Sequence, residues 1–151
     1  MLREFPETRF VLIGQGPLES EVRRTVQRAG LADRVLFTGF REDAIRLATC
    51  FDIYAASSIF EGLSIALLEV MGLGCPAVVT RAGGFPEVVR DQENGVLVPT
   101  ADAGALAGAI RDLLRDGDRR AALGRAARGR AADFDIRTTM RRTEEIYGSL
   151  A

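Results

Sequence analysis

Residues 57–71 read SSIFEGLSIALLEVM, and this stretch decides how the rest of the chain is interpreted. It predicts a turn that holds Glu61, followed by an apolar helix that holds Glu69 eight positions later. Residues 62–75 carry no other charge. A carboxylate among leucine and valine side chains is costly to bury without hydrogen-bond donors. The helix therefore either turns Glu69 toward water or holds it where a ligand with paired donors meets it.

The composition predicts a globular protein that does not bind nucleic acid. With 151 residues, the chain is long enough for a hydrophobic core, and one domain over residues 1–151 is expected. Its formal net charge of −1 gives no electrostatic footprint for nucleic acid or an anionic membrane. The first five residues are too charged for a signal peptide, and the sequence has no run of 18 apolar residues. We expect a cytoplasmic protein, with the inner membrane face as the alternative for a full-length form.

Residue types that are missing exclude several kinds of chemistry within this chain. All 20 basic residues are arginine and there is no histidine, which excludes an imidazole base or ligand and the lysine of a Walker-type P-loop. The two cysteines, Cys50 and Cys75, match no metal-site spacing. We expect both to be small buried residues in a reducing compartment, and we expect no metal site.

Short apolar runs alternate with amphipathic segments along the chain. Strands are predicted at residues 9–13, 34–38, 52–56, 76–80 and 95–99, and helices at 18–29, 42–50, 64–73, 86–90, 102–115, 118–132 and 137–150. Asp102 and Asp118 are the predicted N-caps of two helices. The strands lack period-two alternation, which is typical of strands covered on both faces. The pattern predicts an α/β fold: a Rossmann-like parallel sheet of about five strands flanked by helices, with C-terminal helices.

The loops after the strands are the places where a ligand is expected, because open parallel sheets bind ligands beyond the carboxyl ends of their strands. These loops are residues 14–17, 39–41, 57–64, 81–85 and 99–102. Four of the five contain glycine, but a tight turn needs glycine as much as a close ligand does, so glycine decides little. Gly14 and Gly16 lack the third glycine of a dinucleotide fingerprint, so they are weak evidence for a cofactor.

The spacing of the two glutamates favours a nucleotide sugar. A helix that opens at residues 62–64 presents free backbone amides, which suit a phosphate. The Glu69 carboxylate accepts two hydrogen bonds side by side, as a vicinal diol such as ribose donates them. The stretch thus offers sites for sugar, phosphate and ribose in order. The residues themselves leave an alternative open, in which Glu61 is an exposed loop residue and Glu69 is the structural partner of an arginine.

Several motifs in one order resemble glycosyltransferase family 4. They include the paired glutamates of residues 57–71, GCPAV at 74–78, GGFPEVV at 83–89 and NGVLVP at 94–99. Upstream, FVLIGQGP at 10–17 and VLFTGF at 35–40 are similar to the same family. The resemblance covers nearly the whole chain. A nucleotide-sugar epimerase or phosphorylase of related fold normally uses histidine and basic residues that this chain lacks.

The resemblance implies the C-terminal, donor-binding half of a GT-B-fold retaining enzyme of the hexosyltransferase type. Such an enzyme transfers a sugar from a nucleotide-diphosphate sugar to an acceptor, and it needs no metal because a positive cluster neutralises the leaving diphosphate. In the family, the first glutamate approaches the sugar hydroxyls, the second holds the ribose, the amides between them contact sugar and diphosphate, and the loop at 39–41 lies along the base. The implied site residues are Glu61 as the catalytic residue and, for substrate binding, Glu69, Gly62, Leu63, Ser64, Gly39, Phe40, Arg41, Gly14 and Gly16.

The sequence departs from the family pattern where the diphosphate is neutralised. The family places an arginine and a lysine on the first strand and helix of this half, and the chain starts after them. We therefore expect an incomplete C-terminal half, without the N-terminal acceptor domain, that does not transfer sugar by itself. A non-catalytic nucleotide-binding or interaction module is the alternative. Arg41, Arg81 and Arg90 are candidate phosphate contacts or solvated side chains, and the other arginines, in residues 111–142, are expected on ordinary helix faces.

The missing first strand also carries an expectation about the sheet. We expect the strand near Arg9 to pair with the strand near Asp52, or a second copy of the chain to fill the gap and give a homodimer through exposed strand edges. The alanine- and glycine-rich residues 101–132 predict tight helix packing. The apolar side of the last helix is expected to be exposed or covered by a partner, having crossed to the missing half in a full-length enzyme.

Overall fold

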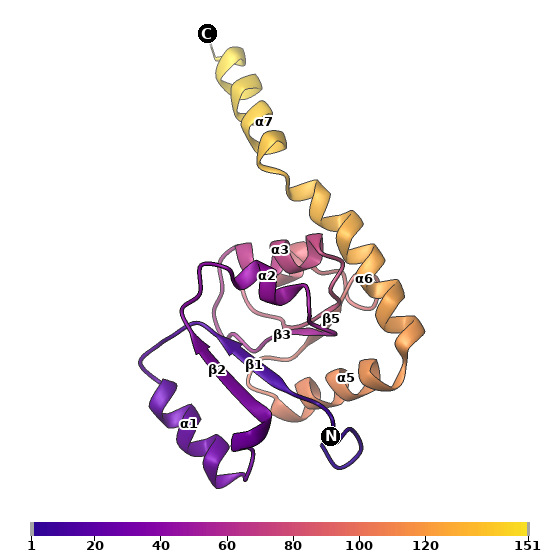
Figure 1. Ribbon diagram of the computed structural model, residues 1–151. Helices are drawn as coiled ribbons and strands as arrows, with labels where there is room; N and C mark the ends of the chain where they lie inside the picture. Colours follow the sequence, from indigo (N-terminus) through magenta and orange to yellow (C-terminus); the bar gives the residue numbers. More distant parts are fainter. Residues whose placement is uncertain (1, 151) are drawn as a thin grey trace. The chain divides into compact units, whose positions relative to one another are not determined.

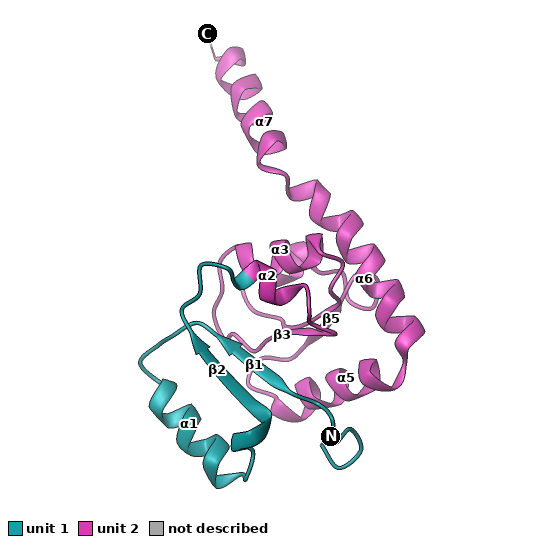
Figure 2. Ribbon diagram, viewed as in Figure 1, with its two compact units in different colours: residues 1–44 teal, residues 45–151 magenta. Residues whose placement is uncertain are grey.

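The computed structural model describes residues 2–150, which form two compact units. Figure 2 shows the first unit, residues 1–44, in teal and the second unit, residues 45–151, in magenta. Both units contain parallel strands connected by helices, as the alternation of apolar and amphipathic segments predicted.

The first unit is a two-stranded parallel sheet with one connecting helix. Its elements are β1 (Phe10–Ile13), α1 (Glu19–Arg28), the 3-10 turn η1 (Ala32–Arg34) and β2 (Val35–Gly39). Phe10 lies opposite Val35, and the register shifts between Leu12 and Ile13. The Arg23 guanidinium of α1 lies 4.2 Å from the centroid of the Phe37 ring of β2, so the helix packs on the sheet through an arginine–aromatic contact.

The second unit is built on a three-stranded parallel sheet in the order β3-β4-β5. Figure 1 labels its elements along the chain. They are α2 (Ala44–Ala48), β3 (Tyr54–Ala56), α3 (Ile65–Gly72), β4 (Ala77–Thr80), α4 (Phe85–Val88), β5 (Val96–Val98), α5 (Ala103–Arg115), α6 (Gly117–Ala131), the 3-10 turn η2 (Ala132–Phe134) and α7 (Ile136–Ser149).

The central strand β4 is buried along its whole length, and successive side chains enter different hydrophobic clusters. Val79 belongs to the cluster that contains Leu67, Met71 and Phe85 of α3 and α4. Val78 belongs to the cluster that contains Leu113 and Leu123 of α5 and α6. Because successive side chains of a strand point to opposite faces, β4 is covered on both sides, and this explains why its sequence does not alternate.

The α/β fold with parallel strands is confirmed. Within residues 2–150, β1 pairs with β2 in the first unit, and β3 pairs with β4 in the second unit. Pairing of the strand near Arg9 with the strand near Asp52, or with a second copy of the chain, stays a prediction.

One predicted helix cap is confirmed and the other is wrong. Asp102 caps α5, since its Oδ1 accepts a hydrogen bond of 2.8 Å from the Ala105 amide. Helix α6 begins at Gly117, and Asp116, not Asp118, accepts the hydrogen bond from the Arg119 amide, at 2.8 Å. Asp116 has the extended backbone of an N-cap, with φ −114° and ψ 90°, so the helix starts one residue after it.

The expected tight packing in the alanine- and glycine-rich segment is confirmed where α6 meets the end of α3. A Cβ atom on Gly124 would overlap the backbone carbonyl oxygen of Gly74. Three residues later, Ala127 is fully buried. The absence of a side chain at position 124 therefore sets how closely α6 approaches α3.

The apolar side of helix α7 is exposed. This is one of the two outcomes that the sequence predicted, the other being a partner that covers it. None of its described side chains is buried, and Figure 1 shows it extending away from the sheet of the second unit. Its large exposed apolar residues include Ile136, Met140, Ile146 and Tyr147. No helix in residues 2–150 is long and apolar enough to cross a lipid bilayer.

The two cysteines differ in exposure, which corrects the expectation that both are buried. Cys75, after α3, is 5% exposed, and burial raises the pKa of its thiol to about 11. Cys50 is exposed because α2 ends two residues before it and its side chain does not enter the core.

We predict that Gly124→Ala and Gly129→Ala have opposite effects on stability, although both lie in α6. The methyl group of an alanine at position 124 would overlap the Gly74 backbone, so overpacking should lower the free energy of unfolding by about 1–3 kcal/mol. Gly129 has open space around it, and alanine there should raise the free energy of unfolding by about 0.5–1 kcal/mol. Urea unfolding followed by circular dichroism measures the free energy of unfolding of both variants. Equal changes in the two variants would contradict the close contact between Gly124 and Gly74.

We predict that one thiol per chain reacts quickly with Ellman's reagent at pH 8. The Cys75 thiol stays neutral until the pH approaches its raised pKa of about 11, so about one part in a thousand is thiolate at pH 8. Cys50 is exposed and should supply the fast thiol. Cys50→Ser should remove the fast phase, and guanidinium chloride should reveal the second thiol. Two fast thiols in the native wild-type chain would contradict the burial of Cys75.

Candidate ligand-binding site

Three loops of the second unit share one edge of its sheet. Because β3, β4 and β5 are parallel, their carboxyl ends lie at the same edge. The loops that leave this edge are residues 57–64, 81–84 and 99–102. Predicted site residues Glu61, Gly62, Leu63 and Ser64 all belong to the first of them, and Glu69 lies on the helix that follows.

The first two loops interlock through a pair of glycines. The Gly84 amide donates a hydrogen bond of 3.3 Å to the carbonyl oxygen of Glu61. A Cβ atom on Gly83 would overlap that same oxygen, and a Cβ atom on Gly84 would lie 2.6 Å from the carbonyl oxygen of Gly62. Gly83 also has a positive φ of 47°. Glycine is therefore required here for a close approach of two backbones.

The Glu61 carboxylate is held by a neighbour on its own loop. Glu61 is half-buried, and its Oε2 accepts a hydrogen bond of 3.2 Å from the Ser58 hydroxyl. The carbonyl oxygen of Ser58 in turn accepts a hydrogen bond of 2.5 Å from the hydroxyl of Thr80, the last residue of β4. Glu61 is thus a half-buried side chain with a hydrogen-bond partner, which differs from the exposed loop residue of the alternative interpretation.

Helix α3 begins as the sequence predicted. Ser64 is its N-cap, with a hydrogen bond of 3.3 Å from the Leu67 amide to the Ser64 hydroxyl. Among residues 2–150, no hydrogen-bond acceptor is recorded for the backbone amides of residues 62–66. The pKa of the Tyr54 phenol is raised, chiefly by burial and further by the charge of Glu61, against the lowering effect of a hydrogen bond with Ser64. The free amides form a positive end to the helix.

Glu69 faces water. Val70 and Met71 of α3 enter the core, whereas Glu69 is exposed. Within the part of the chain that the structure describes, no hydrogen bond or ion pair to the Glu69 side chain is recorded. The arginine partner of the alternative interpretation is therefore not found among these residues, and the carboxylate is available to a ligand.

The other predicted site residues lie together in the first unit, at the carboxyl ends of β1 and β2. The Gly14 amide donates a hydrogen bond of 2.8 Å to the Gly39 carbonyl oxygen, and both glycines have positive φ angles, of 114° and 67°. Gly16 follows and accepts a hydrogen bond from the Glu19 amide. Phe40 is 70% exposed.

The three arginines considered as phosphate contacts have carboxylate partners. Arg41 forms two hydrogen bonds with Asp43, of 2.7 and 2.8 Å, which raise the pKa of the guanidinium and lower that of the carboxyl. Arg81 pairs with Asp91 at 2.8 Å. Arg90 lies 3.9 Å from Glu93. These pairs are exposed and contribute little stability, so a ligand phosphate has only weak competition for the guanidinium groups.

Arg130 is a supporting residue that sequence reasoning missed, since it was expected on an ordinary helix face. Its guanidinium donates hydrogen bonds to the backbone carbonyl oxygens of Glu87, at 2.8 Å, and Val88, at 3.3 Å. It also pairs with Asp133 at 2.8 Å, and its guanidinium carbon lies 4.8 Å from the centroid of the Phe134 ring. Arg130 therefore fixes the end of α4, whose beginning follows the glycine pair. The one feature of the sequence that could have indicated this role is Phe134, an aromatic residue four positions after Arg130.

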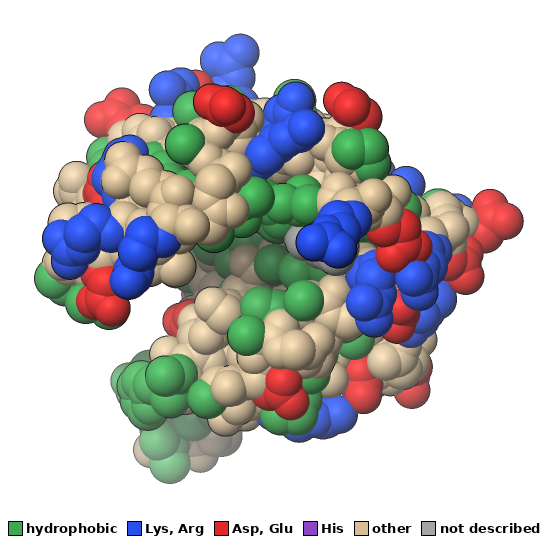
Figure 3. All heavy atoms as spheres, turned by 90° about the horizontal axis from the view of Figure 1, so that it is seen from below, with side chains coloured by type: hydrophobic (Ala, Val, Ile, Leu, Met, Phe, Trp, Pro, Cys, Tyr) green, Lys and Arg blue, Asp and Glu red, His purple; other side chains and the backbone are tan. Residues whose placement is uncertain are grey.

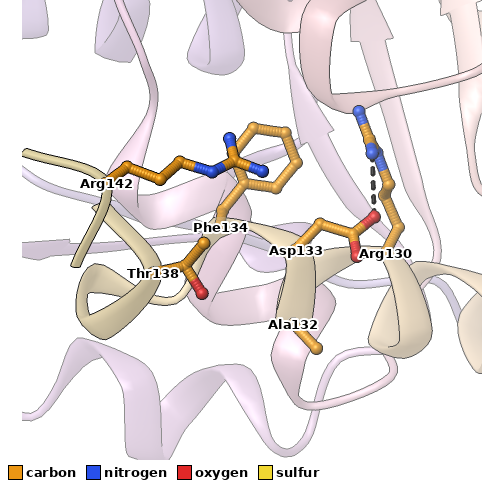
Figure 4. Close-up of a pocket in the computed structure, with 6 residues that line it drawn as sticks. All are labelled: Arg130, Ala132, Asp133, Phe134, Thr138 and Arg142. Atoms are coloured by element: carbon orange, nitrogen blue, oxygen red, sulfur yellow. Dashed lines mark hydrogen bonds and ion pairs between the residues drawn. The ribbon is translucent and has the colours of Figure 1, made fainter. Parts of the chain in front are cut away.

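The same arginine lines a cavity of about 460 Å³ formed by α6, η2 and α7. Figure 4 shows its lining residues and marks the contact between Arg130 and Asp133 with a dashed line. None of the lining residues belongs to the loops that hold the glutamates. The volume therefore does not mark the site that the glutamates predict.

Surface charge and metal-binding side chains add two observations. On the face that Figure 3 shows, arginine and acidic side chains are interspersed over the surface. Within residues 2–150, no group of three or more cysteine, aspartate or glutamate side chains is arranged so that it could hold a metal ion. The polar groups at the sheet edge are carboxylates, hydroxyls and free amides, a set that suits a ligand with both hydroxyl groups and negative charge.

Comparison with known sequences identifies the family. The family model described as "Glycosyl transferases group 1" matches residues 1–130. The GDP-mannose-dependent alpha-(1-6)-phosphatidylinositol monomannoside mannosyltransferase of Mycolicibacterium smegmatis is 34% identical over 154 residues, which cover 95% of this chain and 40% of the relative. The lipopolysaccharide core biosynthesis mannosyltransferase LpsB of Rhizobium meliloti is 33% identical over 135 residues. The match covers 87% of this chain and 38% of LpsB.

Solved structures show the same fold. The crystal structure of HepE from Anabaena in complex with UDP has a TM-score of 0.90 and 29% identity, covering 95% of this chain and 42% of HepE. HepE has also been crystallised with UDP-glucose, with a TM-score of 0.88. The C-terminal domain of a group 1 glycosyltransferase (LpcC) from Francisella tularensis has a TM-score of 0.78 and 28% identity, covering 87% of this chain and 72% of that domain.

The chain thus spans about two fifths of the length of the curated relatives that it matches. Its parallel sheets flanked by helices correspond to the C-terminal half of a GT-B fold. By its sequence and its fold, the chain belongs to the group 1 glycosyltransferase family.

Proposed function

We propose that residues 1–151 serve as the donor-binding domain of a retaining glycosyltransferase of the hexosyltransferase type. The observation that carries the proposal is the row of polar groups along α3: the half-buried Glu61, the free amides of residues 62–66 and the exposed Glu69. Glu69 lies four residues after the start of α3, about 6 Å along its axis. This separation suits the distance between the diphosphate and the ribose of one nucleotide.

In this proposal each polar group has one part of the donor to bind. Glu61 accepts hydrogen bonds from the sugar hydroxyls, the amides of Gly62, Leu63 and Ser64 bind the sugar and diphosphate, and Glu69 accepts two hydrogen bonds from the ribose. The amides stabilise the negative charge that develops on the leaving diphosphate, without a metal ion. That the similar protein HepE has been crystallised with UDP and UDP-glucose supports a nucleotide sugar as the ligand.

The predicted site residues of the first unit are proposed to contact other portions of the donor. Gly39, Phe40 and Arg41 are expected along the base, and Gly14 and Gly16 near the substrate. Their loops lie at the carboxyl ends of parallel strands, as such contacts require.

We predict that the chain binds a nucleoside diphosphate and that Glu69→Ala weakens this binding. Loss of two hydrogen bonds to a charged carboxylate should raise the dissociation constant about tenfold to a hundredfold. Glu144→Ala is the matched control, since Glu144 is exposed on α7, outside the proposed site. Isothermal titration with UDP and GDP measures the effect, and EDTA should leave it unchanged.

The outcomes separate the two interpretations. Binding that is lost with Glu69 and kept with Glu144→Ala supports the donor site. No binding of either nucleotide by the wild-type chain contradicts it and favours the alternative, an interaction module. A dissociation constant that rises strongly when EDTA is added contradicts the metal-free site.

We also predict that this chain by itself does not transfer sugar. It spans about two fifths of its relatives' length, and in the proposal the acceptor is bound by other residues. Incubation with a radiolabelled nucleotide sugar and lipid, glycan or water as acceptor should release no labelled product above background. Turnover by the isolated chain, abolished by Glu61→Gln, would contradict this prediction.

A further inference from the structure

A chain of hydrogen bonds connects the buried end of β4 to the Glu61 carboxylate. Thr80 is 3% exposed, and its hydroxyl donates to the Ser58 carbonyl oxygen at 2.5 Å. The Ser58 hydroxyl donates to Glu61 Oε2 at 3.2 Å. Ser58 is the link between a rigid strand and the carboxylate, because it accepts with its backbone and donates with its side chain.

The backbone of Glu61 is fixed separately from its side chain. The Gly84 amide donates to the Glu61 carbonyl oxygen at 3.3 Å, and Gly83 has no room for a side chain against that oxygen. Since the main chain is already held by the second loop, the Ser58 hydroxyl acts on what remains free, which is the rotamer of the side chain.

The two carboxylate oxygens of Glu61 are in different situations. Oε2 accepts the hydrogen bond from Ser58, whereas no partner of Oε1 is recorded among residues 2–150. A carboxylate with one oxygen anchored presents the other in a defined direction, so a ligand hydroxyl that binds it does not have to order a mobile side chain.

We propose that Ser58 is a positioning residue, which, with Thr80 behind it, fixes the Glu61 carboxylate in the unliganded protein so that Oε1 receives a hydroxyl of the donor sugar. This inference rests on the proposed function for the identity of the ligand. The fixed orientation itself is a property of the free chain. The alternative, that Ser58 merely stabilises the turn, predicts a loss of stability without any change in the preference for the sugar.

The first test compares UDP with UDP-glucose by isothermal titration. Ser58→Ala should reduce the gain in affinity that the glucose group adds to UDP by about tenfold, as expected for a lost hydrogen bond to a charged group. The affinity for UDP itself should stay unchanged, because Ser58 acts only on the sugar-binding glutamate. Ser57→Ala is the matched control, since Ser57 is the exposed neighbour in the same turn. Ser58→Thr keeps the hydroxyl and should restore the gain.

The second test does not use a ligand. Three-bond scalar couplings of the Glu61 side chain should report one dominant rotamer in the wild-type chain and in Ser57→Ala. In Ser58→Ala they should report averaging over several rotamers. Thr80→Val, which keeps the shape of the buried side chain, should give intermediate averaging, and it serves as the second variant if Ser58→Ala does not fold.

The results separate the positioning role of Ser58 from the proposed function of the chain. Rotamer averaging in the unliganded wild-type chain overturns the positioning role, whatever the binding data show. A Ser58→Ala chain that weakens UDP and UDP-glucose equally overturns it as well. If the wild-type chain binds neither nucleotide, the proposed function fails, and the couplings still decide whether Ser58 orients Glu61.

Discussion

The close contact between two loops, made possible by Gly83 and Gly84, is the constraint on which the second unit's site depends. These glycines let the loop after β4 lie directly against the backbone of Glu61 and Gly62. Without that contact, the loop of Glu61 would be held to β4 only through the hydrogen bond between Thr80 and Ser58. With it, the backbone of Glu61 is also held directly by the loop that follows β4, and β4 is buried along its whole length and covered on both faces. The order of the site therefore comes from hydrophobic burial several residues away.

The same loop is braced from its far end by a different kind of interaction. Helix α4 is a single turn, too short to be stable through its own hydrogen bonds. Arg130 satisfies two carbonyl oxygens there, and Phe85 anchors the other end in the core at 1% exposure. Burial and charge-assisted hydrogen bonds thus act on opposite ends of one segment. The exposed arginine–carboxylate pairs of the chain, such as Arg81 with Asp91, contribute far less to this order.

The sequence predicted well what depends on local pattern. The apolar runs, the start of α3 at Ser64 and the cap at Asp102 follow from residues close together in the chain. What it could not predict depends on geometry between distant residues. Asp116 and Asp118 are equally good caps by residue type, and only the backbone angles select Asp116. Arg130 donates to backbone carbonyl oxygens of α4, which no residue type marks. The glutamate spacing was visible from the start, whereas the Ser58 hydrogen bond was not.

The missing side chain at Gly124 has a consequence for how related sequences vary. Helix α6 touches the end of α3 at Gly124 and carries Arg130 six residues further along. One helix therefore contacts both α3, which follows the glutamate loop, and α4, which follows the glycine loop packed against it. A larger residue at position 124 would move α6 away from α3 and withdraw Arg130 from the carbonyl oxygens of Glu87 and Val88. Substitutions at these positions are therefore expected to arise together in evolution, with a change at one accepted only after a compensating change at the other.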